Sequence, residues 1–214
     1  MKIRTSNEEY VRKILKELKK MDYIRPEEIP DIHLYMDQVT TFMDEHLKES
    51  KRFPNDKMLT KTMINNYTKN NLLPSPVKKK YSKEHMLLLI FIYYFKNILT
   101  ISDIQSIFGP LTERFYGEEK EISLEEIYKE VFSFEQDQID ALTRDVIRKF
   151  KSAERSFDDV KNEEDREFLI TFTFICLLSF DVYVKKMMIE KLIDNHLSER
   201  FPSKNGKTTE NKKA

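Results

Sequence analysis

Apolar residues recur at spacings of three and four along most of the chain, and stretches in which apolar and polar residues alternate are few. The first pattern is typical of amphipathic helices and the second of half-buried strands. The 214 residues include only 3 Gly, too few for the glycine-rich loops that hold phosphates in P-loop and dinucleotide-binding proteins. The sequence therefore predicts an all-α protein and excludes nucleotide enzymes of those two kinds.

Prolines and polar caps separate the helices expected in the first half of the chain. Helices are predicted at 7–21, 37–48, 60–70, 83–97 and 102–108. Residues of N-cap type begin three of them, namely Thr60, Ser82 and Ser102. The apolar face expected for the first helix consists of Tyr10, Ile14 and Leu18, and that of the second consists of Val39, Phe42, Met43 and Leu47. Asn71 can take the left-handed conformation that ends a helix.

The second half reads as acidic amphipathic helices followed by one long apolar helix. These helices are predicted at 123–134, 137–152 and 163–197. Ser123 and Glu126 have the spacing of a capping box, and the inner face expected for that helix consists of Ile127, Val131 and Phe134. The last helix is apolar on nearly every side between Phe168 and Val184, which is typical of a central bundle helix or of one shared between subunits. We expect a homodimer through these C-terminal helices.

The two most apolar runs, Met86–Phe95 and Phe168–Phe180, are shorter than the roughly 20 residues that a membrane span needs. We expect both to be buried helices, and no membrane association. The single cysteine, Cys176, lies in the second run and is expected to be a buried thiol. One cysteine excludes a disulfide scaffold and indicates a reducing cytoplasm.

Charge is strongly segregated although the net charge is zero. Residues 51–81 contain eight basic residues and one acid, whereas residues 118–145 contain ten acids and three basic residues. The basic segment would attract a polyanion such as nucleic acid. A lysine-rich surface can also be only a solvated face. The short helix in this segment, however, carries hydroxyls and amides that can bind phosphates and base edges, with Met63, Ile64 and Tyr67 left to pack inward.

The stretch from Met63 to Pro74, the run Lys79–Glu84, Phe91–Ile92 and Ile104 together resemble the DNA-binding domain of MerR-type winged-helix regulators. Asn71 stands where that family usually has Gly, and Lys79 replaces the arginine of its wing. Asn65 and Asn66 replace a helix Arg and Tyr of the family, so the contacts of those two residues do not carry over. The whole chain, with Ile29–Met36 ahead of this segment, is also similar to the bacterial domain-of-unknown-function family 1836.

The resemblance implies an N-terminal winged helix-turn-helix, with room for a small two-stranded wing, followed by a C-terminal helical bundle. The implied parts are an N-terminal helix (1–29), a MerR-like domain (30–110), an acidic bundle that dimerises (111–201) and a disordered tail (202–214). Double-stranded DNA is the expected partner. Groove-facing contacts would come from Thr62, Asn65, Asn66 and Lys69, and wing contacts to phosphate from Lys78, Lys79, Lys80 and Tyr81.

We therefore expect a cytoplasmic DNA-binding transcriptional regulator. The alternative is a protein-interaction adaptor that uses the winged-helix scaffold without binding DNA. The four histidines are scattered, so no metal or other cofactor is expected, and His85 is expected to be exposed at a helix start. No nucleophile is combined with a base, and we expect no enzymatic activity.

Overall fold

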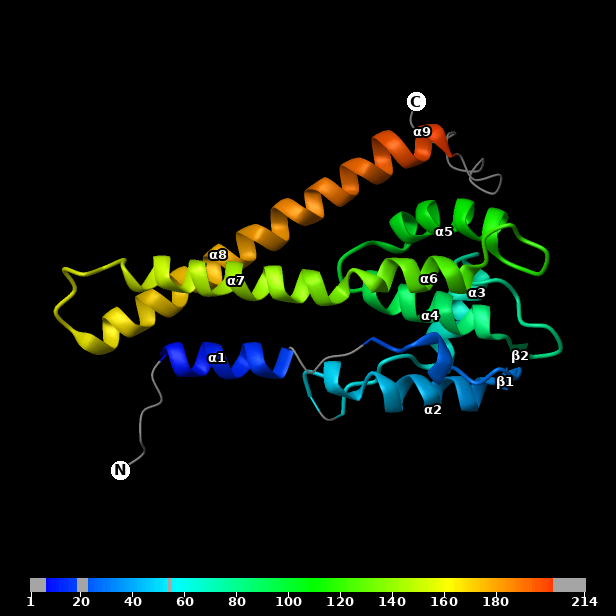
Figure 1. Cartoon of the computed structure of the whole chain (residues 1–214), viewed down its shortest axis with the longest axis horizontal. Helices are drawn as coiled ribbons and strands as arrows, with labels where there is room; N and C mark the ends of the chain where they lie inside the picture. The colour runs from blue at the N-terminus through cyan, green and yellow to red at the C-terminus, as the bar shows by residue number, and fades with distance from the viewer. Residues whose placement is uncertain (1–6, 19–22, 54, 202–214) are drawn as a thin grey trace. The chain divides into compact units, whose positions relative to one another are not determined.

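The computed structural model describes residues 7–18, 23–53 and 55–201 (Figure 1). It is mostly helical with one small sheet, as the all-α prediction requires. The chain forms two compact units, Met1–Asp22 with Ser133–Met187, and Tyr23–Phe132 with Met188–Ala214. The domain boundaries taken from the sequence stay predictions, and the expected tail at 202–214 lies outside the described residues.

The larger unit is built around α4 (Lys83–Phe95), in which every residue from His85 to Tyr93 is buried. A helix with no polar side must be covered all round. The core cluster around it includes side chains of α2 (Met36–His46), α3 (Lys61–Lys69), α5 (Ile101–Phe115) and α6 (Leu124–Ser133). The short turns η1 (Pro26–Glu28) and η2 (Lys48–Ser50) lie before and after α2 in the chain. The predicted burial of the run Met86–Phe95 is confirmed for Met86–Tyr93. The predicted apolar face of α2 is confirmed as well, because Val39, Phe42, Met43 and Leu47 are all buried.

Two short strands, β1 (Leu34–Tyr35) and β2 (Lys80–Tyr81), form the sheet of this unit. They are antiparallel, with Leu34 opposite Tyr81 and Tyr35 opposite Lys80. Leu34 and Tyr81 are buried, so one side of the ladder joins the core. The strand that pairs with β2 is thus the segment before α2, and at the predicted wing Lys80 adds an isolated antiparallel bridge with Val77.

Helix α5 begins earlier and ends later than predicted. Thr100, not Ser102, is its N-cap, since the Asp103 amide donates to Thr100 Oγ1 at 3.2 Å while the Asp103 carboxylate accepts from the Thr100 amide at 3.0 Å. This reciprocal pair satisfies two otherwise free helix-end donors. The helix then continues through Gly109 and the buried Pro110 to Phe115.

Helix α6 has the predicted cap but a different inner face. The Glu126 amide donates to Ser123 Oγ at 3.2 Å, and Glu126 Oε2 accepts from the Ser123 amide at 2.8 Å. Leu124 and Tyr128 are buried in the core and Phe132 packs against it, whereas Val131 and Phe134 are exposed. The predicted stripe of Ile127, Val131 and Phe134 is therefore wrong. Two neighbouring stripes of α6 are apolar. The stripe that faces the core is the one with Tyr128, whose ring packs against that of Phe91 with centroids 5.3 Å apart.

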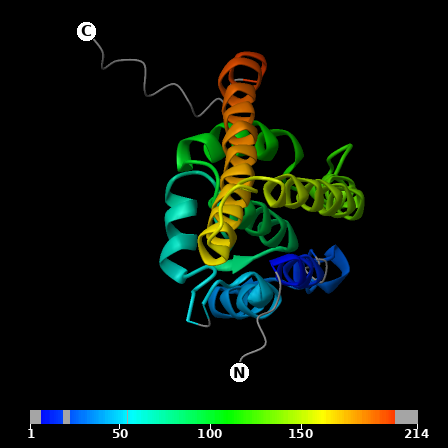
Figure 2. The same cartoon turned by 90° about the vertical axis from the view of Figure 1, so that its left-hand side faces the viewer.

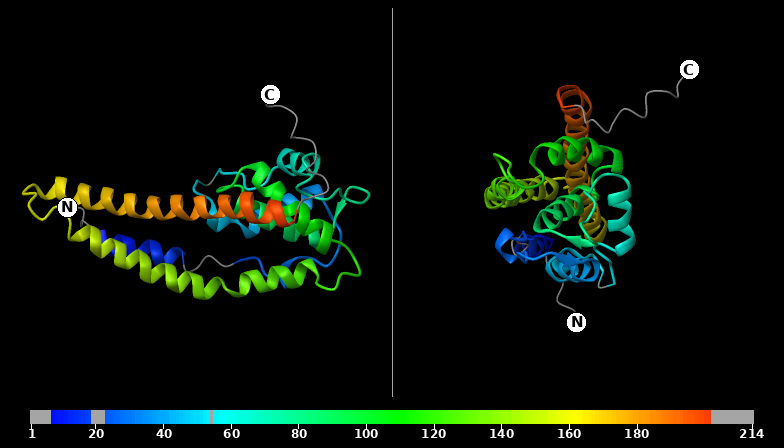
Figure 3. Two further views of the ribbon diagram at one scale, coloured as in Figure 1. Left: turned by 90° about the horizontal axis from the view of Figure 1, so that it is seen from above. Right: turned by 90° about the vertical axis from the view of Figure 1, so that its right-hand side faces the viewer.

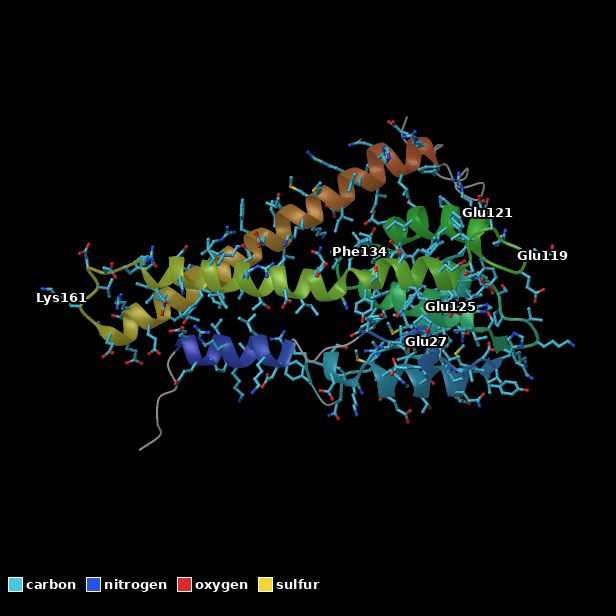
Figure 4. All side chains as sticks on the ribbon, viewed as in Figure 1. Glu27, Glu119, Glu121, Glu125, Phe134 and Lys161 are labelled. Carbon is cyan, nitrogen blue, oxygen red and sulfur yellow. The ribbon has the colours of Figure 1, made fainter. Side chains whose placement is uncertain are left out.

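A network of ion pairs ties α6 to neighbouring parts of this unit. Lys129 Nζ lies 3.0 Å from both Glu27 and Glu125, and Lys83 Nζ lies 2.8 Å from Glu125. The two glutamates are labelled in Figure 4. The hydrogen bond from Lys83 is the main reason that the pKa of Glu125 lies below its usual value. Tyr128 adds a buried hydrogen bond of 2.6 Å from its hydroxyl to the Ile24 carbonyl.

The smaller unit contains α1 (Asn7–Leu18), α7 (Glu135–Glu154) and most of α8 (Glu163–Leu192) (Figure 3). Its core consists of Val11, Leu15 and Phe150, with partly buried Val146, Ile147 and Phe174 packed against them. The face predicted for α1 is wrong, because Tyr10 and Ile14 are exposed and the neighbouring stripe of Val11 and Leu15 is buried. After α8 come the π-helical turn η3 (Ile193–Leu197) and α9 (Ser198–Arg200), which belong to the larger unit.

Helix α8 is apolar but largely uncovered, contrary to the prediction that Phe168–Phe180 is buried. Phe168 is 67% exposed and Phe180 66%, and Cys176 is exposed as well. The cause is that the described core of this unit meets α8 on one side only, at Phe174. The continuous helix from Glu163 to Arg200 is long and apolar enough to cross a membrane. Its most apolar 18 residues have a mean hydropathy of 1.8, and 6% of that stretch is buried.

The observed face of α6 can be tested by comparing two truncations on neighbouring stripes. Leu124→Ala removes a fully buried side chain and should lower the free energy of unfolding by about 2–5 kcal/mol. Val131→Ala removes a half-exposed one and should change it by less than about 1 kcal/mol. Urea denaturation measures both. A larger loss for Val131→Ala would contradict the observed packing.

Candidate nucleic-acid interface

Helix α3 has one buried side and one polar side. Thr60 caps it, accepting a hydrogen bond of 3.2 Å from the Met63 amide, as predicted. Ile64 and Tyr67 are buried in the core. The opposite side is exposed and carries the four groove-facing candidates, Thr62, Asn65, Asn66 and Lys69. The helix lies at the outside of its unit (Figure 2), so this polar side is open to solvent.

The predicted left-handed residue ends α3. Asn71 has φ of 55°, a conformation that Asn tolerates better than most residues. The chain then turns inward, and the Leu72 amide donates to the Tyr67 carbonyl at 2.9 Å. Leu72 and Leu73 are buried directly after this turn. The polar helix is thereby anchored at its C-terminal end.

A tight hairpin tip follows at residues 77–80. The Lys80 amide donates to the Val77 carbonyl at 3.0 Å, and the two residues between them, Lys78 and Lys79, have φ of 50° and 62°. Two successive left-handed residues form the kind of turn that usually contains Asn-Gly. Lysine in this conformation costs roughly 1–2 kcal/mol per residue. Both lysines are exposed, so the turn presents two charges at its tip at a cost in stability.

The other two wing candidates are positioned differently. The Lys80 ammonium lies 5.2 Å from the centre of the Tyr35 ring, and the lysine is half-buried. Tyr81 is buried, and burial raises the pKa of its hydroxyl. Its expected position at the phosphate surface is corrected, because pairing of β2 with β1 turns this side chain into the core. The described tip thus exposes Lys78 and Lys79, with Lys80 beside them.

His85 is buried, whereas the sequence predicted an exposed histidine. Its Nδ1 accepts a hydrogen bond of 3.0 Å from the Ser82 amide, and the Tyr116 hydroxyl lies 3.1 Å from the same nitrogen. Burial lowers the pKa of His85 to about 4, although backbone groups of Pro74 and Ser75 oppose the shift. The neutral imidazole therefore joins the base of the hairpin to the start of α4.

Two acids of α2 reduce the positive charge of this region. Lys51 Nζ lies 2.7 Å from Asp44, and Lys61 pairs with Asp37. Lys69, Lys78 and Lys79, in contrast, are exposed to solvent. The positive potential is consequently concentrated at the end of α3 and at the hairpin tip.

A second basic surface, on α7 in the smaller unit, was missed by the sequence analysis. Four basic residues recur at spacings of 4, 3 and 4, namely Arg144, Arg148, Lys151 and Arg155. With Ile147 and Ser152 they line a hollow of about 310 Å³. This spacing is visible in the sequence, but the acidic segment was taken to end at Asp145, and so it included only Arg144 of these four basic residues. Arg148 also pairs with Asp145, which partly neutralises it.

Within the part of the chain that the structure describes, no group of three His, Cys, Asp or Glu side chains could hold a metal ion. What the described residues do assemble is a polar helix face and a lysine-bearing turn on the same compact unit. The class defined by the fold is a mostly helical protein with a small antiparallel sheet.

Comparison with known proteins places the chain in a family. The domain of unknown function DUF1836 matches residues 24–131, half of the chain, and the chain belongs to this family. The matched region includes α3, the hairpin and α4. No curated protein and no solved structure matches the chain.

The buried His85 should make stability depend on pH. The unfolded chain takes up a proton near pH 6.5 and the folded chain only near pH 4, so acid favours unfolding between these values. We expect the free energy of unfolding to fall by up to about 3 kcal/mol from pH 7 to pH 4 on this account. Chemical denaturation across this range should show a flatter profile for His85→Asn. His196→Asn, at an exposed position, is the control. If the free energy of unfolding of His85→Asn fell as steeply with acid as that of the unaltered protein, the pH dependence could not be assigned to His85.

At the hairpin tip, the effect of backbone strain on stability can be measured separately from the effect of the two lysine charges. Lys78→Asn with Lys79→Gly supplies the residues that this turn prefers, and should raise the free energy of unfolding by about 1–2 kcal/mol. Calorimetry or urea denaturation measures the change. Lys78→Ala with Lys79→Ala removes the same charges without relieving the backbone and is the matched control. Equal stability of the two double variants would show that the lysines are not strained.

Proposed function

We propose that this protein is a DNA-binding transcriptional regulator in which α3 enters the major groove and the hairpin tip at 77–80 acts as a wing. The observation that carries the proposal is the exposed polar face of α3, combined with two lysines in left-handed conformation at the nearby turn. The order of elements supports the proposal, because α2 and α3 are followed by the hairpin and α4, as a winged helix-turn-helix would require.

The roles of the side chains follow from their chemistry. Asn65 and Asn66 can each donate to and accept from a base edge, and Thr62 can do so with its single hydroxyl. Lys69 and the two tip lysines would neutralise phosphates and so orient α3. Groups on α3 would supply sequence preference, whereas the wing would supply affinity that depends on salt.

Backbone strain at the turn supports the same function. Strained residues persist where their surroundings enforce them, and they concentrate at functional sites. Asn-Gly would make this turn more easily than Lys78 and Lys79. Two exposed charges at a costly backbone position are well explained if they contact a polyanion.

A second candidate is a protein-interaction adaptor whose basic face binds an acidic protein. The ion pairs of Lys51 with Asp44 and of Lys61 with Asp37 favour it, because they lower the charge available to DNA. The asparagines of α3 are equally suited to a protein surface. This candidate predicts saturable binding of an acidic protein and no affinity for duplex DNA at low salt.

The test is fluorescence anisotropy of the full chain with random-sequence duplexes at several salt concentrations. Lys78→Glu with Lys79→Glu should weaken binding and lower the slope of log affinity against log salt by about 2, since two phosphate contacts are lost. Lys13→Glu with Lys16→Glu, at exposed positions of α1, changes the net charge equally and is the matched control.

Each result of this experiment has a clear meaning. A lower slope in the tip variant alone supports the proposed interface. An equal change of the salt slope in both double variants would show only a response to net charge and would contradict the proposed role of the hairpin tip as a wing. Absence of binding by the unaltered protein at low salt would contradict DNA binding and favour the adaptor.

A further inference from the structure

The uncovered side of α8 carries a regular apolar stripe. Positions spaced by 4, 3, 4 and 3 residues are all exposed, namely Phe168, Phe172, Ile175, Ser179 and Val182. Phe172 is 54% exposed, Ile175 55% and Val182 62%. This alternation of three and four is the spacing by which one helix packs along another. Large aromatic and aliphatic side chains left in water along a helix are typical of an interaction surface.

The other side of α8 is already occupied within the same unit. Phe174 packs on Phe150 of α7, with ring centroids 5.4 Å apart. Asp181 pairs with Lys149 of α7 at 2.6 Å. These contacts orient the helix, because Phe174 and Asp181 lie two turns apart and both face α7. The stripe is therefore the side that α7 leaves open.

The two ends of the stripe have opposite charge. Residues 163–167 contain four acids and one arginine, and residues 185–191 contain three lysines and one glutamate. Asp165 and Lys186 continue the stripe itself, three residues before Phe168 and four residues after Val182. Acidic first turns and basic last turns also suit the dipole of a single helix. Here, however, they border an exposed apolar surface and so determine which orientation of a partner helix is favourable.

We propose that the protein forms a homodimer in which α8 packs against α8 of a second copy in antiparallel orientation, with the two-fold axis close to Cys176. Antiparallel packing brings the acidic end of each helix to the basic end of the other, whereas parallel packing would bring like charges together. The apolar stripes then cover one another. Because the surface is self-complementary only under a two-fold rotation, it closes at two copies.

A lipid bilayer is a poorer occupant of this surface, despite the length and hydropathy of α8. Lys149 of α7 contacts both Asp145 and Asp181, and Asp181 directly follows the apolar run Phe168–Phe180. A membrane around α8 would have to enclose these charges together with α7. Burying ion pairs in hydrocarbon is costly, whereas a second copy covers only the open side.

The dimer does not depend on the proposed DNA binding and can be tested without DNA. Its central position is marked by the single native cysteine, which is exposed beside Ile175. Mild oxidation of the purified full chain with copper phenanthroline should give a dimer linked through Cys176 that reducing agent reverses. Light scattering before oxidation should give twice the 25.8 kDa mass of the chain.

Orientation is tested in a Cys176→Ser background. Asp165→Cys and Lys186→Cys lie at opposite ends of the stripe, roughly 30 Å apart along one helix. When the two variant proteins are mixed, they should cross-link to each other, while each alone should stay unlinked. Cross-linking of Asp165→Cys with itself would show a parallel pair and overturn the proposed orientation.

The surface itself is tested by a charge placed on or off the stripe. Phe172→Glu should convert the dimer to a monomer, whereas Thr171→Glu, an exposed neighbour off the stripe, should stay dimeric. Circular dichroism should report equal helix content for both variants. A monomeric unaltered protein, a dimer that survives Phe172→Glu, or co-sedimentation of the unaltered protein with phosphatidylglycerol vesicles in place of dimerisation would overturn the proposal.

Discussion

Burial of α4 on every side is the constraint on which the larger unit depends. A helix whose residues from His85 to Tyr93 all avoid water can exist only if other elements surround it. Tyr128 of α6 contributes both a ring contact and a buried hydroxyl, while Ile64 and Tyr67 attach α3. Because the apolar side of α3 packs into this core, its polar side faces outward. The candidate interface is thus a consequence of how α4 is covered.

The hairpin is held by the same core. Leu72 and Leu73 are buried before it, and Tyr81 and His85 are buried after it. Only the tip between these anchors is free to project, and that is where Lys78 and Lys79 lie. Helix α8 is the counterpart of α4, because its composition also demands cover, yet one side of it has none within the described chain. A second copy would satisfy the same physical requirement that α2, α3 and α6 satisfy for α4.

Local features could be predicted from the sequence, and features set by distant contacts could not. The Thr60 cap, the left-handed Asn71 and the capping box of Ser123 with Glu126 depend on neighbouring residues, and all are confirmed. The faces of α1 and α6 were each predicted one stripe away, because several stripes of these helices are apolar and tertiary packing selects among them. The pairing of β1 with β2 joins residues more than forty positions apart, which local patterns do not encode.

The candidate interface shows the same division. Exposure of Thr62, Asn65, Asn66 and Lys69 was predicted, because helical periodicity alone puts them opposite Ile64 and Tyr67. Burial of Tyr81 and His85 was not, since it depends on β1 and on Tyr116. The basic stripe of α7 was overlooked for a different reason. A count of charge along the chain does not register a pattern that is regular only around a helix.

The most direct test of the account is hydrogen exchange of the full chain, followed by mass spectrometry, with and without a random-sequence duplex at low salt. If α3 and the hairpin tip contact DNA, exchange should slow in residues 61–71 and 77–80 when the duplex is present. The basic stripe at 144–155 is the internal reference and should be unaffected. Slowed exchange at 144–155 alone, or no change at 61–71 under conditions where the duplex is bound, would contradict the proposed interface.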